Sequence, residues 1–140
     1  MLSVDELAAA VDADLRALSD RWSVEVVVTE GVPEQVRETA ARHGLSMPEL
    51  FPHAVQVRHD GFPYIQLALS CRLADQGAQL EESIEQLKTV VAEVTTEEWP
   101  RCPHHRHALV PKYERGSLGW ACPSMREVLV PLGGLSRLRR

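Results

Sequence analysis

The 140-residue sequence predicts an α+β fold with a small three-stranded antiparallel-type sheet and two main helices. Two stretches repeat apolar residues every three or four positions, the spacing of a helix with one buried face. Between them, short runs alternate apolar with polar residues, as half-buried strands do. A change in composition follows residue 98. The sequence therefore predicts a body over residues 1–98, a hairpin over 99–125 packed on it, and a C-terminal tail over 126–140.

The first helix is predicted over residues 4–19. Ser3 and Glu6 have the spacing of a capping box, in which each side chain binds the other residue's backbone N–H. The apolar stripe that follows is expected to face the core. It consists of Leu7, Val11, Leu15, Leu18 and Trp22.

The first strand is predicted over residues 23–29, which contain four valines and are followed by Gly31 and Pro33. Pro33 suits the first position of a short helix, and Gly44 suits the position just after its end. The sequence therefore predicts a second, shorter helix between these two residues.

A hairpin and a long helix complete the predicted body. Val55 and Val57 alternate with polar residues, Asp60-Gly61 supplies a tight turn, and the return strand runs to Leu69. The long helix is predicted over residues 75–96, before Pro100. Its apolar stripe consists of Leu80, Ile84, Leu87, Val91 and Val94.

Charge is distributed unevenly along the chain. Residues 1–98 contain 18 acidic and 7 basic side chains, a net charge of −11, whereas residues 99–140 contain 2 acidic and 8 basic ones, a net charge of +6. The break at Glu98/Trp99 marks a boundary between modules. The basic end is expected to dock on the acidic body of the same chain, while an acidic partner or nucleic acid is the alternative.

Soft metal ligands gather near the C-terminus. Two of the three cysteines and three of the six histidines fall within 21 residues. Cys102 and His105 have Cys-x-x-His spacing. Short strands at 107–111 and 117–120, with a turn at 114–116, would bring Cys122 back to Cys102. Thiolate and imidazole are ligands that zinc prefers, so the sequence predicts a C-terminal zinc-knuckle hairpin.

The fourth ligand is less obvious from the sequence. Met125 stands where a second knuckle would have its last ligand, but a thioether is a poor zinc ligand. An extended chain after His105 would place His105 and His107 on the same side. His104 stays open as a substitute for either histidine. The predicted ligands of one structural zinc ion per chain are Cys102, His105, His107 and Cys122.

The segment resembles the zinc-ribbon class, in which a knuckle, a hairpin and a second knuckle preceded by an aromatic residue follow one another. It also resembles the Trp-Pro-x-Cys-Pro-x-His … Trp-x-Cys-Pro tail of small uncharacterised bacterial proteins. The resemblance covers residues 99–125 and implies metal ligation by Cys102, His105 and Cys122. It implies no activity, and Met125 departs from the ribbon pattern.

We expect a zinc-stabilised protein that is not an enzyme. Residues 99–125 contain few large apolar side chains, and a structural zinc contributes on the order of 10 kcal/mol in zinc-finger peptides. Trp99 and Trp120 are expected to pack across the hairpin and shield the metal, or simply to dock on the sheet. No catalytic residue is predicted, because the chain lacks a nucleophile elbow, a phosphate loop, a dinucleotide fingerprint and an H-E-x-x-H motif. The expected role is an accessory protein whose acidic body binds a protein partner.

Two alternatives stay open. One is a metal-dependent hydrolase with an open fourth metal position and Glu97 or Glu98 as general base. The other is a nucleic-acid accessory protein, against which the net charge of −5 argues. Its contacts would come from Arg101, Arg106, Lys112, Arg115, Arg126 and the terminal arginines.

The expected location is the cytoplasm. No apolar run reaches the roughly 18 residues that span a bilayer, and the acidic N-terminus is not followed by a signal region. In a reducing compartment, three cysteines favour metal binding or free thiols over disulfides. Cys71, remote in sequence from the other two, is predicted to be a buried apolar residue. No membrane contact is expected.

Overall fold

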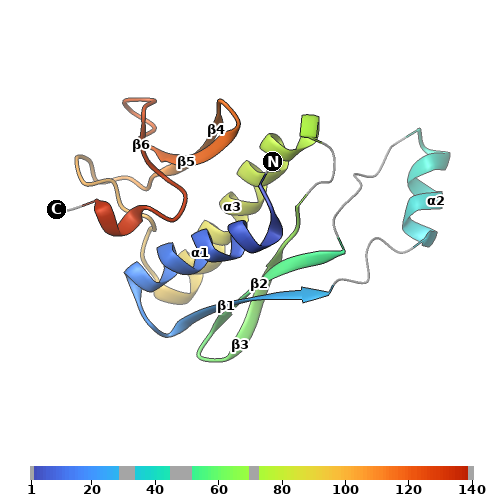
Figure 1. The fold of residues 1–140 in the computed structure, drawn as a ribbon, viewed down its shortest axis with the longest axis horizontal. Coiled ribbons are helices and arrows are strands. Elements are labelled where there is room, and N and C mark those ends of the chain that lie inside the picture. The colour runs from blue at the N-terminus through green and yellow to red at the C-terminus, as the bar shows by residue number, and fades with distance from the viewer. Residues whose placement is uncertain (1, 29–33, 45–51, 70–72, 139–140) are drawn as a thin grey trace.

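Two long helices pack against a three-stranded sheet in a computed structural model that describes residues 2–28, 34–44, 52–69 and 73–138 (Figure 1). Helix α1 spans Val4–Leu18. Its capping box is confirmed, because the Glu6 N–H donates to Ser3 Oγ at 3.1 Å and the Ser3 N–H donates to Glu6 Oε1 at 3.4 Å. This cap fixes where the helix begins.

The first sheet contains strands β1 (Trp22–Val28), β2 (His53–His59) and β3 (Phe62–Leu67) in that order, all antiparallel. The predicted hairpin is confirmed. Its turn residues Asp60 and Gly61 have φ angles of 51° and 81°, which match a two-residue hairpin turn. Residues Thr29 and Cys71, both covered by sequence predictions, lie outside the described residues.

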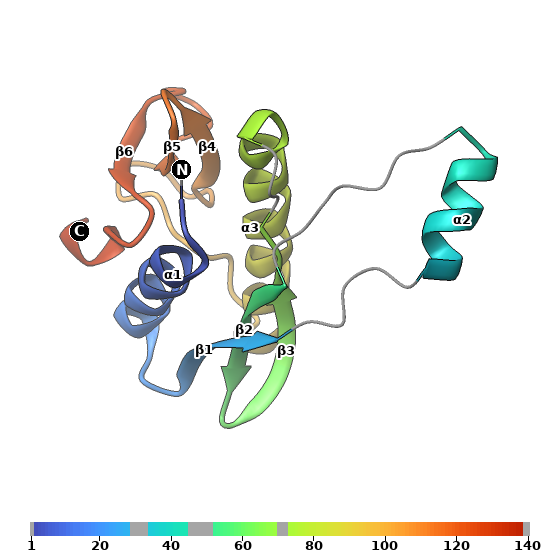
Figure 2. The ribbon, with the colours of Figure 1, turned by 45° about the vertical axis from the view of Figure 1, so that its right-hand side comes forward.

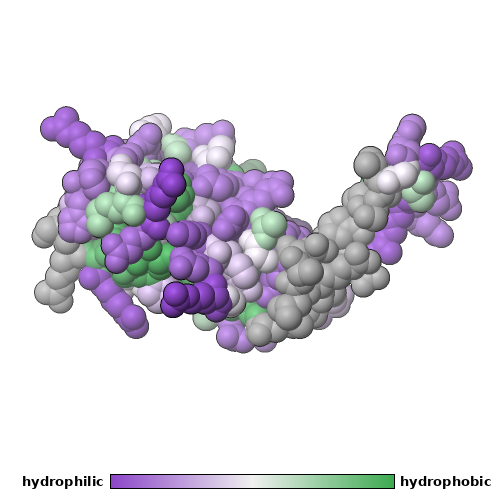
Figure 3. Space-filling view, turned by 90° about the horizontal axis from the view of Figure 1, so that it is seen from above, coloured by the Kyte–Doolittle hydropathy of each residue, from purple (hydrophilic) through white to green (hydrophobic). Residues whose placement is uncertain are grey.

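Helix α2 (Glu34–Arg42) lies in the connection between β1 and β2, where Pro33 and Gly44 predict a short helix. It stands clear of the other labelled elements in Figures 1 and 2. Figure 3 shows it set apart at one end of the molecule, with a mostly hydrophilic surface.

Helix α3 (Leu73–Thr95) is the predicted long helix, with its start two residues earlier than expected. Its buried stripe meets that of α1 over the sheet, and together they form one hydrophobic core. The least exposed helical members of this core are Leu7, Val11, Leu15, Leu80, Ile84, Leu87 and Val91.

A second sheet follows the break at residue 98. It contains β4 (Val110–Glu114), β5 (Ser117–Ala121) and β6 (Val128–Pro131), all antiparallel. Strand β4 begins later than predicted, because an isolated bridge between Arg101 and Ala108 closes the preceding loop. The predicted turn at 114–116 is confirmed, with φ angles of 53° at Arg115 and 78° at Gly116.

The segment predicted as a C-terminal tail, residues 126–140, contains a strand and a short helix that the sequence analysis did not predict. Strand β6 pairs with β5, and a short 3₁₀ helix, η1, follows at Leu135–Arg137. Val130 lies opposite Trp120 and is buried, so this part of the tail completes the second sheet. The α+β class is confirmed, while the division into body, hairpin and tail stays a prediction.

The second sheet and its flanking loops, residues 99–138, are called the C-terminal lobe below. Figure 2 shows the lobe beside α1 and α3. The Asp14 carboxylate of α1 accepts hydrogen bonds from Trp120 Nε1 (2.8 Å) and from the backbone N–H groups of Gly133 (2.7 Å) and Leu135 (3.0 Å). Burial raises the pKa of Asp14 above its ordinary value, although all three hydrogen bonds act to lower it.

A second contact joins the lobe to α3. The Tyr113 N–H donates to Glu81 Oε1 at 2.7 Å, and the Tyr113 ring lies over Gly77. A Cβ at Gly77 would come within 2.5 Å of that ring, so only glycine permits this approach.

None of the described helices is both long enough and apolar enough to cross a membrane.

Candidate metal centre

The loop that carries three of the predicted ligands is held closed by backbone hydrogen bonds. The Leu109 N–H donates to Pro100 O at 2.7 Å, and the Cys102 N–H donates to His107 O at 3.1 Å. With the Arg101–Ala108 bridge, these bonds fold residues 102–107 into a narrow loop at the base of β4. Cys102, His105 and His107 therefore share one small volume although they span six residues.

The remaining cysteine is presented by a tight turn after β5. The Arg126 N–H donates to Cys122 O at 2.7 Å, and the Cys122 N–H donates to Glu127 O at 3.1 Å. Arg126 adopts a φ of 56°, which lets the chain reverse into β6. Cys122 is thus fixed between two strands of the second sheet.

The four predicted ligands come together in the structure. Their ligand atoms all lie within 4.8 Å of one another. His105 Nδ1 is 3.5 Å from Cys102 Sγ and 3.3 Å from Cys122 Sγ, and His107 Nε2 is 3.9 Å from Cys122 Sγ. Ligand atoms at zinc bond lengths stand roughly 3.4–3.8 Å apart in a tetrahedron. The cluster could therefore hold a metal ion, and within the described residues it is the only such group of His, Cys, Asp and Glu side chains found.

Burial and polarity at the two thiols suit a metal ligand. Cys102 is 5% exposed and Cys122 is fully buried, and both are free of disulfides. Burial acts to raise the pKa of the Cys122 thiol, but backbone hydrogen bonds from Met125 and Ser124 and the Cys102 side chain outweigh it, so the pKa is lowered. A lowered pKa favours the thiolate, the form that binds metal.

The two histidines differ in their surroundings. His105 is exposed and His107 is half-buried, and their rings stack with centroids 4.8 Å apart. His107 Nε2 lies 2.9 Å from Ser124 Oγ, while His107 Nδ1 is buried with no hydrogen-bond partner. Ser124 is a member of the site that the sequence analysis missed. Its position within the second Cys-Pro turn was the available signal.

The structure brings only one of the two alternative histidines, His107, into the cluster. His104 is exposed and lies outside the cluster, while His107 lies within it. Met125 is 47% exposed and also lies outside it. That the four residues bind metal stays a prediction.

The tryptophans on either side of the loop pack together. Trp99 and Trp120 meet edge to face with ring centroids 5.5 Å apart, and both are buried. Trp120 also binds Asp14 of α1 through its indole N–H. Their packing thus joins the loop of residues 102–107 to the core of the body.

The residues proposed for the alternative functions are spread over several places. A hollow beside the cluster is lined by Arg101, Cys102, Pro103, His105 and Arg106. Neither Glu97 nor Glu98 lines that hollow, and Glu98 instead borders a different one beside Trp99.

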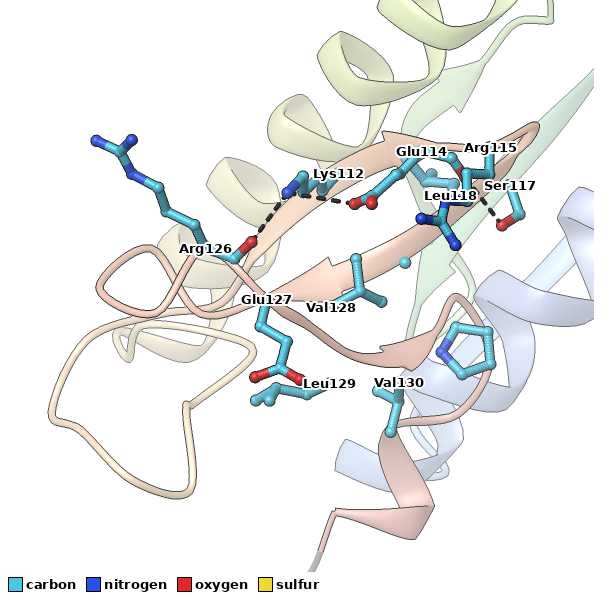
Figure 4. A pocket seen from close by; sticks show the side chains of 12 residues that line it. Lys112, Glu114, Arg115, Ser117, Leu118, Arg126, Glu127, Val128, Leu129 and Val130 are labelled. Atoms are coloured by element: carbon cyan, nitrogen blue, oxygen red, sulfur yellow. Dashed lines mark hydrogen bonds and ion pairs between the residues drawn. The ribbon is translucent and has the colours of Figure 1, made fainter.

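Three other basic residues surround a groove on the outer face of the second sheet (Figure 4). Lys112 there is bound to Glu114 at 3.2 Å and to the Arg126 carbonyl at 2.9 Å. Arg115 and Arg126 lie at the rim of the same groove, whose floor is largely apolar. Five of these basic residues therefore divide between two separate hollows, while Arg137 lines neither of them.

No protein-family model, curated protein or solved structure matches this chain.

Proposed function

We propose that this protein is a zinc-stabilised accessory protein, in which one structural zinc ion per chain holds the C-terminal lobe in shape and the body binds a protein partner. The observation that carries the proposal is the convergence of Cys102, His105, His107 and Cys122 within 4.8 Å. Two segments 15 residues apart supply these ligands, His107 and Cys122 being the nearest members of each. A metal bound there would cross-link the two ends of the β4–β5 hairpin.

Zinc is the metal that this ligand set favours. Two thiolates and two neutral imidazoles form a Cys2His2 set, which is typical of closed structural zinc sites. The two thiolates balance the charge of the ion, so the buried site would carry no net charge. Carboxylate-rich sites, which suit magnesium or calcium, have no counterpart among the four residues.

The position of the site supports a structural role. Four protein ligands fill a tetrahedral zinc ion and leave no position for substrate. The two cysteines are buried in the same core as Trp99, Leu109 and Trp120. A metal there would add a cross-link between the loop of residues 102–107 and the turn after β5.

The proposed partner is a protein with a basic surface. The body carries a net charge of −11 over residues 1–98, and its helix α2 exposes most of its residues. Such a field attracts a positively charged partner and steers its approach. Five basic side chains of the C-terminal lobe lie in two separate hollows, an arrangement that does not favour nucleic acid as the partner.

Elemental analysis of protein purified without chelator tests the metal part. We expect about one zinc per chain in the wild type and much less than one in Cys102→Ala and Cys122→Ala. His104→Ala is the matched control, because its side chain is exposed and lies outside the cluster, and it should keep its zinc. Wild-type protein that is fully folded without metal would overturn the proposal.

The second candidate, a hydrolase with an open metal site, is favoured by the hollow beside Cys102 and His105. In that case His107 would stay on Ser124, 2.9 Å away, and leave the fourth position to water. The His107→Ala variant separates the two functions. It should lose zinc if His107 is a ligand, and should retain it if the site is open. Cobalt substitution gives a second readout, because the visible spectrum reports the number of thiolate and imidazole ligands.

A further inference from the structure

Strand β1 differs from the other strands at the edges of the two sheets. Within the described residues the edge strands are β1, β3, β4 and β6. Three of these four contain a proline, namely Pro63, Pro111 and Pro131. A proline offers no N–H to a neighbouring strand and is a common protection of a sheet edge. Strand β1 has none.

Three alternate valines of β1 are increasingly exposed toward the C-terminal end of the strand. Val24 and Val26 lie opposite Val57 and Val55, which are fully buried in the core. Val24 is half-buried, Val26 is 37% exposed, and Val28 is 76% exposed. Because these three residues alternate along the strand, they share the face that looks to the core. The apolar face of the first sheet therefore continues to an edge that nothing described in the chain covers.

The charged side chains around this edge are already paired within the chain. Glu25 lies 3.4 Å from Arg58, and Arg21 binds Asp60. Within the described strand the edge therefore offers a run of valines whose only charged neighbour, Glu25, already has a partner. An occupant that is itself neutral and valine-rich matches it best, and a second copy of β1 has those properties.

We propose that the chain forms a homodimer in which β1 pairs antiparallel with β1 of a second copy, so that the two first sheets become one six-stranded sheet. A two-fold axis at Val26 sets Val26 opposite Val26 of the second copy, and Val24 opposite Val28 of the second copy. Such a contact is isologous, so one patch satisfies both copies and the assembly closes at two.

Charge disfavours the neighbouring register with its axis at Glu25. With the axis at Val26, Glu25 lies opposite Val27 of the second copy. An axis at Glu25 would set two glutamates directly opposite each other, which is destabilising. A shift of the partner strand by one residue would move its valines to the other face of the sheet. The inference does not depend on the zinc proposal.

Sedimentation velocity of the zinc-loaded full chain, from 1 to 100 µM, tests the proposal. The wild type should sediment as a dimer at the upper end of this range. Val26→Lys and Val28→Lys place a charge on the core side of the edge and should each raise the dimer dissociation constant at least tenfold. Val36→Lys is the control, because Val36 is a 46% exposed valine on α2, away from β1, and it should leave the dimer unchanged.

Disulfide cross-linking tests the register and does not depend on the lysine variants folding. Val26→Cys should form a covalent dimer on mild oxidation, because the two copies of residue 26 face each other at the axis. Val24→Cys should not, because its two copies lie four residues apart along the strands. A wild type that stays monomeric at 100 µM would overturn the proposal. So would a dimer that both lysine variants leave intact, or cross-linking at residue 24 but not at residue 26.

Discussion

The body and the C-terminal lobe are stabilised by different means. In the body, two helices place long apolar stripes on a sheet, and side chains such as Leu15 and Ile84 are fully buried. The lobe contributes fewer residues to that core, among them Leu109 and Trp120, and its hydrogen bonds to α1 converge on one buried carboxylate, Asp14. Its loops converge on four candidate metal ligands.

This difference implies that the two regions respond differently to the same disturbance. A core of many apolar contacts contains no group that titrates or binds metal, so pH and chelators should change its stability little. A lobe that depends in part on polar contacts and, by our proposal, on a metal should be sensitive to pH and to chelators. The four predictions that follow test this contrast, from the largest expected effect to the smallest.

Removing the metal should have the largest effect. Zinc binding is worth on the order of 10 kcal/mol in zinc-finger peptides, so the lobe should loosen when a chelator takes the ion away. We expect the backbone N–H groups of β4, β5 and β6 to exchange with deuterium at least a hundredfold faster, while those of α1 and β2 change little. If exchange became equally faster in the lobe and in the body, the two regions would unfold as one unit, and they would not differ in how they are stabilised.

Asp14→Asn should have the next largest effect, a loss of about 3 kcal/mol in the free energy of unfolding. The carboxylate accepts three hydrogen bonds from the lobe, and an amide has only one oxygen to accept them. At least one buried N–H would then face an NH₂ group. Urea denaturation gives the value.

Asp12→Asn is the matched control for that substitution. Asp12 also lies on α1, but its bond is an exposed ion pair with Arg16 at 2.9 Å. Such pairs contribute about 0.3–0.5 kcal/mol. Equal losses from the two variants would show that Asp14 does not join the lobe to the body.

The body was largely predictable from the sequence, because its elements follow from local periodicity. The stripe of α1, the Asp60-Gly61 turn and the stripe of α3 each require only neighbouring residues to be recognised. Asp14 was overlooked, although it falls on the same face of α1 as Leu7 and Val11. The role of Asp14 depends on its hydrogen bonds with Trp120 and Gly133, which lie more than a hundred residues away in the sequence. No local pattern reveals such a contact.

The lobe was less predictable. Its ligands were recognised by residue type, and His107 by the alternation of side chains in an extended chain, but no local pattern removed His104 as a substitute. Strand β6 was missed because its four residues are short of a recognisable alternation and lie between the charged pair Arg126-Glu127 and a pair of glycines. Pairing with β5 can stabilise β6 only after the β4–β5 hairpin has folded.

Gly77→Ala should destabilise the protein by about 1–3 kcal/mol, because the new methyl group would overlap the Tyr113 ring. Alanine is the better helix former by about 1 kcal/mol, so the overlap must outweigh that gain. The Gly77→Ala/Tyr113→Ala double variant separates the two terms, since without the ring the alanine should stabilise α3. Thermal denaturation of the four proteins completes the cycle. A cost that persists in the double variant would place the strain elsewhere.

The smallest effect concerns the pH dependence that Asp14 contributes. Burial raises its pKa in the folded state above the ordinary value of 3.8, so the folded chain binds this proton more tightly than the unfolded chain does. As the pH falls through the raised pKa toward 3.8, the contribution of Asp14 to stability should therefore increase, and above the raised pKa it should stay constant. Each pKa unit is worth about 1.4 kcal/mol.

The difference in unfolding free energy between the wild type and Asp14→Asn isolates this contribution, because protonation of the cysteines and histidines affects both proteins alike. Measured in urea with zinc present, the advantage of the wild type should grow as the pH is lowered. An advantage that shrinks instead would mean that the three hydrogen bonds outweigh burial and hold the Asp14 carboxylate ionised. In that case the ionised Asp14 carboxylate would hold the lobe on the body. Protonation of Asp14 in acid would then weaken this contact.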